Sequence, residues 1–170
     1  MLKISNRSSI PPFIVMDVMR AANERAASGS DVLHLEVGQP SSPAPKKVIE
    51  TAQFVLADDK LGYTDALGIS LLREKISGYY RDTYGVNLDP KRIVITSGSS
   101  GGLLLSFLSS FDVGDCVGMA TPGYPAYKNM LKSLGVKVVE VPVDSKSHFQ
   151  LNPEVLDKLS ENLDGLIISS

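Results

Sequence analysis

The chain has 170 residues, of which 43% are hydrophobic and 21% are charged, a composition typical of a folded domain with an apolar core. Its net charge of −2 argues against nucleic acid or an anionic membrane surface as a partner. The one cysteine, Cys116, excludes an internal disulfide framework, and no apolar run reaches the about 20 residues that a membrane helix needs. We therefore expect a cytoplasmic protein that does not contact a membrane.

The predicted elements begin with a short arm and a helix in residues 1–30, where Asp17 and Arg20 interrupt any signal-peptide core. From residue 32 onward, strand-like and helix-like runs alternate. The strand-like runs are "VLHLEVG" (32–38), "RIVIT" (92–96), "DCVGMA" (115–120), "VKVVEVPV" (136–143) and "DGLIIS" (164–169). The helix-like runs are "KKVIETAQFVLAD" (46–58), "GISLLREKISGYYRDTYG" (68–85), a run that begins near Ser99, "AYKNMLKSLG" (126–135) and "NPEVLDKLSENL" (152–163).

Residues that typically start or end helices support this division of the chain. Gly85 and Gly135 are placed to end two of the helices, and Asn152 with Pro153 is a typical helix start. Alternating strands and helices with short connections predict an α/β fold, a mostly parallel sheet with helices on both faces. Because Ser170 directly follows a strand and no helix covers that strand, we expect an incomplete domain. Its open sheet edge predicts association, or partial disorder near residues 144–170.

The stretch "TSGSSGG" (96–102) lies between a strand-like and a helix-like run. Glycine lets a ligand approach the backbone closely, and the first amides of a helix favour an anion. Neither the P-loop spacing nor the G-x-G-x-x-G spacing of dinucleotide sites is present. On these residues alone, a phosphate-binding loop and a simple helix cap both remain open.

Three further stretches carry weaker signals. In "TPGYPAY" (121–127) two prolines restrict a turn that holds Tyr124, whose ring either stacks on a flat ligand or covers the core. "LGYTDALG" (61–68) places Tyr63 in a loop before a helix, and "EVGQPSSPAP" (36–45) places Gly38 after a strand-like run.

Taken in this order, these elements resemble the class I aminotransferases, which are pyridoxal-phosphate enzymes of fold type I. The matching elements are "GQP", "GYTDALGISLLR", "SGSSGG" and "PGYPAY", and the resemblance extends over essentially the whole chain. It implies that residues 1–30 are an N-terminal arm and helix. Residues 31–170 would then be an incomplete large cofactor-binding domain, with its C-terminal remainder and the small domain absent.

The resemblance also implies roles for individual residues. Gly98, Ser99 and Ser100 correspond to the loop that binds the phosphate of pyridoxal 5'-phosphate, and Tyr124 to the aromatic residue that stacks on the cofactor ring. Tyr63 corresponds to a residue that reaches the cofactor phosphate of a neighbouring subunit, which implies a homodimer with shared sites. Gly38 corresponds to a backbone contact to the substrate carboxylate. By the same analogy, Tyr127 packs beneath the loop, and Ile10–Phe13 lines or closes the substrate entrance.

The resemblance implies that the catalytic groups lie elsewhere. The family's Schiff-base lysine, the carboxylate that binds the pyridine nitrogen and the arginine that binds the substrate carboxylate are all expected beyond Ser170. Lys146 is interpreted as a solvated loop charge, and His34 and His148 as structural residues, so no catalytic residue and no metal site is expected in this chain.

The expected function is the transfer of an amino group between an amino acid and a keto acid by the intact enzyme, with this chain inactive alone. A carbon–sulfur lyase or another fold type I enzyme would share all four of the matching elements. A non-catalytic aminotransferase-like ligand-binding domain is a second alternative. An unrelated nucleotide-binding α/β domain would explain the glycine- and serine-rich loop only.

Overall fold

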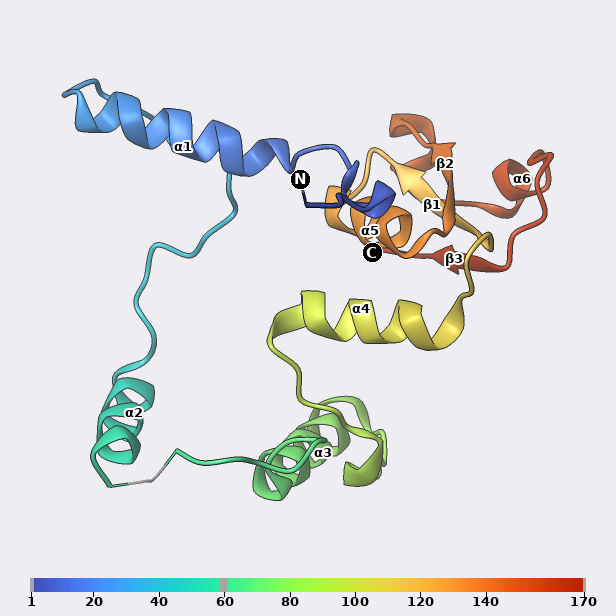
Figure 1. The fold of residues 1–170 in the computed structure, drawn as a ribbon. Coiled ribbons are helices and arrows are strands. Elements are labelled where there is room, and N and C mark those ends of the chain that lie inside the picture. The colour runs from blue at the N-terminus through green and yellow to red at the C-terminus, as the bar shows by residue number, and fades with distance from the viewer. Residues whose placement is uncertain (1, 59–60, 170) are drawn as a thin grey trace. The chain divides into compact units, whose positions relative to one another are not determined.

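The computed structural model describes residues 2–58 and 61–169 (Figure 1). The chain divides into two compact units. One unit runs up to Phe13 and resumes at Thr96, and the other is Ile14–Ile95. Ser170, the last residue of the predicted large domain, lies outside the described residues, and the division at residue 30 stays a prediction.

The unit Ile14–Ile95 consists of helices and irregular segments. Arg73 and Ser77 of its longest helix bind the flanking chain: Arg73 Nε donates to the Gly68 carbonyl and Ser77 Oγ to the Leu88 carbonyl. Gly85 ends that helix in the left-handed conformation, as predicted. The elements are α1 (Ile14–Ala27), α2 (Lys46–Asp58), α3 (Ser70–Tyr84) and the 3₁₀ turn η2 (Pro90–Arg92).

Two predicted strands, residues 32–38 and 92–96, are not strands in the structure. A strand exists only when a neighbouring strand accepts and donates its ladder hydrogen bonds. Neither segment has such a neighbour among the described residues, and the one ladder-like bond of the second joins Ile95 N to the Leu67 carbonyl. The prediction of strands in these two segments was therefore wrong.

The other unit contains the sheet. Its elements are η1 (Asn6–Ser8), α4 (Gly98–Ser110), β1 (Cys116–Thr121), α5 (Pro125–Leu134), β2 (Lys137–Pro142), η3 (Ser145–Ser147), α6 (Pro153–Leu156) and β3 (Gly165–Ile167). Among the described residues the strand order is β2-β1-β3, and both neighbours are parallel to β1. The register pairs Cys116 with Lys137 and Val117 with Gly165. The predicted parallel α/β fold is confirmed.

Helices α4 and α5 supply the core on one face of this sheet. Phe107 of α4 and Leu131 of α5 pack with Val117 of β1 around a cluster in which Leu131 and Val117 are completely buried. On the opposite face of β1, the side chains of Leu163 and Leu166 lie directly over Gly118.

The last predicted helix, residues 152–163, is much shorter than expected. Its start is as predicted, because Asn152 Oδ1 accepts a 2.9 Å hydrogen bond from Val155 N and Pro153 is the first helical residue. The helix ends at Leu156. The polar residues that follow favour turns, and Ser160 Oγ bonds the carboxylate of Glu161 instead of supporting a helix.

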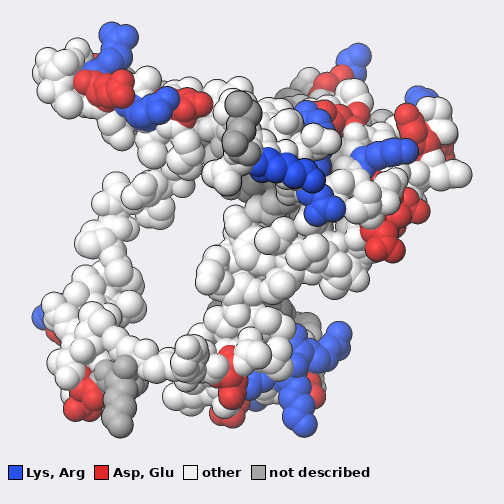
Figure 2. All heavy atoms as spheres, viewed as in Figure 1, with Lys and Arg blue, Asp and Glu red and all other residues white. Residues whose placement is uncertain are grey.

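The charged side chains do not gather into one large patch of a single sign on the visible face (Figure 2). Acidic and basic groups occur next to one another, and several form pairs, such as Lys128 with Glu140 between α5 and β2. No helix in the described part of the chain is long and apolar enough to cross a membrane.

Candidate cofactor site

The first component of the site is the turn after β1. The Thr121–Pro122 peptide bond is cis, and Gly123 follows it. A Cβ atom at Gly123 would lie 2.6 Å from the Ala120 carbonyl oxygen, so this position accepts only glycine without a backbone shift. The turn ends at Tyr124, which is the residue just before α5 and lies at the carboxyl end of the central strand. In parallel α/β sheets, ligands bind at that end of the strands.

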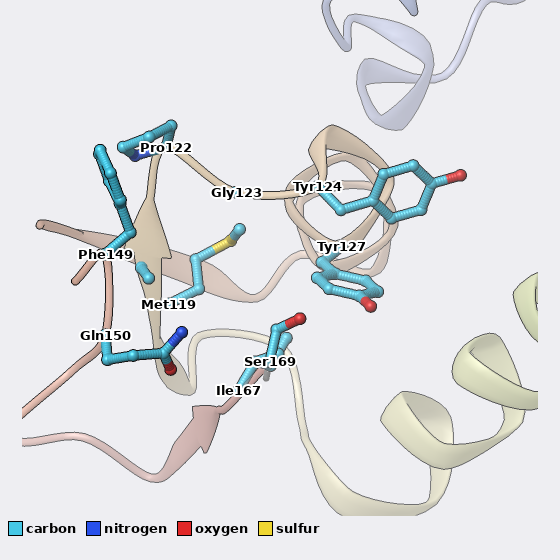
Figure 3. Close-up of a pocket in the computed structure, with 10 residues that line it drawn as sticks. Met119, Pro122, Gly123, Tyr124, Tyr127, Phe149, Gln150, Ile167 and Ser169 are labelled. Carbon is cyan, nitrogen blue, oxygen red and sulfur yellow. The ribbon is translucent and has the colours of Figure 1, made fainter. Parts of the chain in front are cut away.

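Tyr124 presents its ring partly to solvent. Its side chain is 50% exposed, and its ring contacts two other aromatic rings edge-on. The ring centroids of Tyr124 and Tyr127 are 5.2 Å apart, and those of Tyr124 and Phe13 are 6.0 Å apart. Figure 3 shows that Tyr124 and Tyr127 both project from the start of α5. Tyr127 is half-buried, and its predicted position beneath the loop stays a prediction.

The second component is the start of α4. The helix begins at Gly98, one residue before the predicted position, and Gly98 has a φ of +76°. Gly98 N donates to the Thr96 carbonyl, and Thr96 Oγ1 donates to the Gly98 carbonyl. These two bonds form a tight turn into the helix. They use the amide of Gly98 but leave the amides of Ser99 and Ser100 unpaired.

Ser99 and Ser100 offer unpaired donors at this helix start. Both residues are exposed, and within the described chain neither their amides nor their hydroxyls have a hydrogen-bond partner. The Ser97 side chain does not cap the helix either. Unpaired amides at the positive end of a 13-residue helix, flanked by hydroxyls, bind an anion well.

A cavity of about 220 Å³ lies where β1 and β3 end (Figure 3). Phe149 and Gln150, which line it, were not predicted from the sequence, although a polar turn after the carboxyl end of a strand was a usable signal. The lining residues are Met119, Ala120, Pro122, Gly123, Tyr124, Tyr127, Phe149, Gln150, Ile167 and Ser169.

No lysine is among the described residues that line this cavity. The closest in sequence to the turn, Lys128, forms an ion pair with Glu140. Lys146 lies in the exposed turn η3, where its backbone amide bonds the Asp144 carboxylate. Neither of these two lysines is among the described residues that line the cavity.

Two predicted site residues belong to the other unit. Tyr63 is fully exposed, and Gly38 is exposed, with no described atom beyond its two chain neighbours within 4 Å of the place where a Cβ would lie. Near Gly38, His34 Nδ1 forms a 2.7 Å hydrogen bond with Glu36 Oε1, and this bond lowers the pKa of the Glu36 carboxyl. The structure therefore describes the surroundings of both residues, but their roles stay predictions.

The sequence of the chain matches the pattern of a known protein family. The pattern of the family described as "Aminotransferase class I and II" matches residues 30–169, most of the chain. The chain belongs to this family. A valine–pyruvate aminotransferase of Mycobacterium tuberculosis is 44% identical over 168 residues, and a (5-formylfuran-3-yl)methyl phosphate transaminase of Methanocaldococcus jannaschii is 42% identical over 127 residues.

Solved structures of aminotransferases share the fold. The crystal structure of an aminotransferase from Mycobacterium tuberculosis has a TM-score of 0.94 and 43% identity, and covers 99% of this chain. The aspartate aminotransferase of Thermus thermophilus, solved with maleate, has a TM-score of 0.85 and 30% identity over 92% of this chain. The chain spans 43% of the length of the valine–pyruvate aminotransferase and 43% and 41% of the two solved chains. It therefore corresponds to a portion of each of these relatives.

Proposed function

We propose that the protein carrying this chain transfers an amino group between an amino acid and a keto acid with pyridoxal 5'-phosphate as cofactor. The observation that carries the proposal is the pair of unpaired amides at Ser99 and Ser100, at the start of helix α4. Membership of the aminotransferase family supports the reaction class.

The residues at the start of α4 fit the phosphate group of this cofactor. A phosphate carries close to two negative charges, so it needs several donors and a positive potential. The amides and hydroxyls of Ser99 and Ser100 supply the donors, and the helix dipole supplies the potential. Gly98 contributes through its positive φ, which turns the chain into the helix without a side chain in the way.

Tyr124 fits the cofactor ring. A half-exposed phenol ring at the carboxyl end of β1 offers an apolar face to a flat heteroaromatic ligand. When bound, pyridoxal phosphate supplies a ring that accepts the electrons released as the amino acid loses its α-proton. The part of this chain in the reaction is to bind and orient that ring. We expect the lysine that binds the cofactor covalently to lie in the region of the relatives that this chain does not match.

Gly38 and Tyr63 complete the proposal. Gly38 offers an exposed backbone amide to a substrate carboxylate, and the fully exposed Tyr63 is available to the cofactor phosphate of a second subunit. The protein would then be a homodimer with shared sites, in the cytoplasm, where the free thiol of Cys116 stays reduced.

The test is binding of pyridoxal 5'-phosphate, followed by absorbance, with Ser99→Ala/Ser100→Ala against wild type. Because two hydrogen bonds to a charged group are lost, we expect the dissociation constant to rise at least about tenfold. Ser109→Ala is the matched control, since that hydroxyl bonds the Ser106 carbonyl near the far end of the same helix. Equal affinities of the double variant and the control would contradict the phosphate site.

The reaction itself is tested with valine and pyruvate, the substrates in the name of one relative, on the protein that carries this chain. Formation of alanine from pyruvate supports amino transfer. Release of ammonia and pyruvate from a sulfur-containing amino acid, without amino transfer, would identify a carbon–sulfur lyase instead.

A further inference from the structure

The N-terminal arm, residues 2–13, packs against helix α5 in the unit that contains the sheet. Its turn η1 contacts α5, and Asn129 Nδ2 of α5 donates to the Pro11 carbonyl at 3.5 Å. These two residues are 118 positions apart in the sequence. The arm is therefore attached to the helix that begins at the candidate cofactor site.

Phe13, the last residue of the arm, reaches Tyr124. The planes of the two rings are at 90°, with centroids 6.0 Å apart, which is the preferred edge-to-face arrangement of aromatic pairs. Tyr127 contacts Tyr124 in the same manner, with an interplanar angle of 80°. Phe13 is half-buried although most of the arm is exposed, so its side chain is the part of the arm that packs.

The Tyr124 ring has no polar contact that would fix its orientation among the described residues. Its hydroxyl has no hydrogen-bond partner among the described residues, and half of its side chain is exposed to solvent. The backbone before α5 fixes only where the side chain starts, and a half-exposed tyrosine changes rotamer readily. Tyr127 contacts the ring from the first turn of α5, and Phe13 contacts it from the N-terminal arm.

We propose that Phe13 is a positioning residue that holds the Tyr124 ring in the orientation in which it meets the cofactor ring. The inference rests on the proposed function, because it assigns to Phe13 an effect on cofactor binding that acts through Tyr124. It makes the arm part of the proposed cofactor site through the contact of Phe13 with Tyr124.

The test is a double-mutant cycle on the dissociation constant for pyridoxal 5'-phosphate, with Phe13→Leu, Tyr124→Leu and the double variant. Loss of one aromatic contact predicts an about three- to tenfold weaker binding for Phe13→Leu. In the Tyr124→Leu background, the same substitution should have no further effect. Phe13→Tyr, which keeps the ring, should restore binding, and Ile4→Ala, at an exposed apolar residue of the arm, is the matched control.

A second readout does not depend on the cofactor. In the cofactor-free protein, the Tyr124 ring proton resonances should shift on Phe13→Leu, return on Phe13→Tyr and stay unchanged on Ile4→Ala. Unchanged resonances, or a loss of affinity that is the same with and without Tyr124, would overturn the positioning role. If the wild-type protein does not bind pyridoxal phosphate although the resonances shift, the proposed function fails and the contact itself is still established.

Discussion

At the scale of single residues, the backbone of Gly98 decides how the chain enters helix α4. Its φ of +76° lies in the left-handed region, which costs residues with a Cβ about 1–2 kcal/mol. Gly101, three residues later in the same helix, has helical geometry, and a Cβ there would meet Thr96 at an ordinary 3.5 Å. Two glycines of one motif are therefore present for different reasons.

These two positions predict opposite effects of the same substitution. Gly98→Ala should lower the free energy of unfolding by about 1 kcal/mol, because the methyl group strains the left-handed backbone. Gly101→Ala should leave it unchanged or raise it by about 0.5–1 kcal/mol, because alanine is the better helix former. Urea denaturation of both variants measures the difference, and equal effects would show that the turn is not constrained as described.

At the scale of elements, helix α5 is fixed to the sheet by its buried side. Leu131 is completely buried among residues of α4, β1 and the start of β2, whereas Leu105 of α4 is 55% exposed. Leu131→Ala should therefore cost about 2–5 kcal/mol of unfolding free energy, and Leu105→Ala less than about 0.5 kcal/mol. Thermal unfolding of the two variants checks this. A similar loss for both would mean that α5 does not form the core.

The elements also show what a sequence can predict. Gly85, Gly135 and Asn152 marked helix ends correctly, because a cap depends on a few neighbouring residues. Residues 32–38 and 92–96 did not form the predicted strands, because a strand depends on a partner that no local pattern contains. The same distinction applies to the candidate site. Ser99, Ser100 and Tyr124 could be named from the sequence because they lie in local motifs. Phe149 in the cavity and the contact of Phe13 with Tyr124 could not, because they depend on the folded chain.

At the scale of the whole molecule, apolar side chains remain exposed on the helices of the unit Ile14–Ile95. None of the residues of α1, α2 or α3 is buried. Phe54 and Leu56 of α2 are each 67% exposed, and Leu71 of α3 is 63% exposed. Apolar surface of this extent is unusual for a protein that stays monomeric.

We therefore predict that the 170-residue chain associates in solution. Its sedimentation coefficient should rise with protein concentration, and a dye that binds apolar surface should fluoresce with it. A variant with Phe54→Ser and Leu56→Gln should show less of both effects, since it removes apolar surface without touching the sheet. A single monomeric species with one sharp unfolding transition at all concentrations would contradict the prediction.

The strand order has a consequence for synthesis on the ribosome. β1 is the central strand, but its neighbour β3 is made much later: the bond from Cys116 N to Asp164 Oδ2 at the start of this pairing joins residues 48 positions apart. At typical translation rates, that delay is on the order of seconds. The nascent chain can pair β1 with β2 early, but one edge of β1 stays open until β3 emerges. Until then, the newly made protein is exposed to wrong pairing at the strand that ends at the candidate cofactor site.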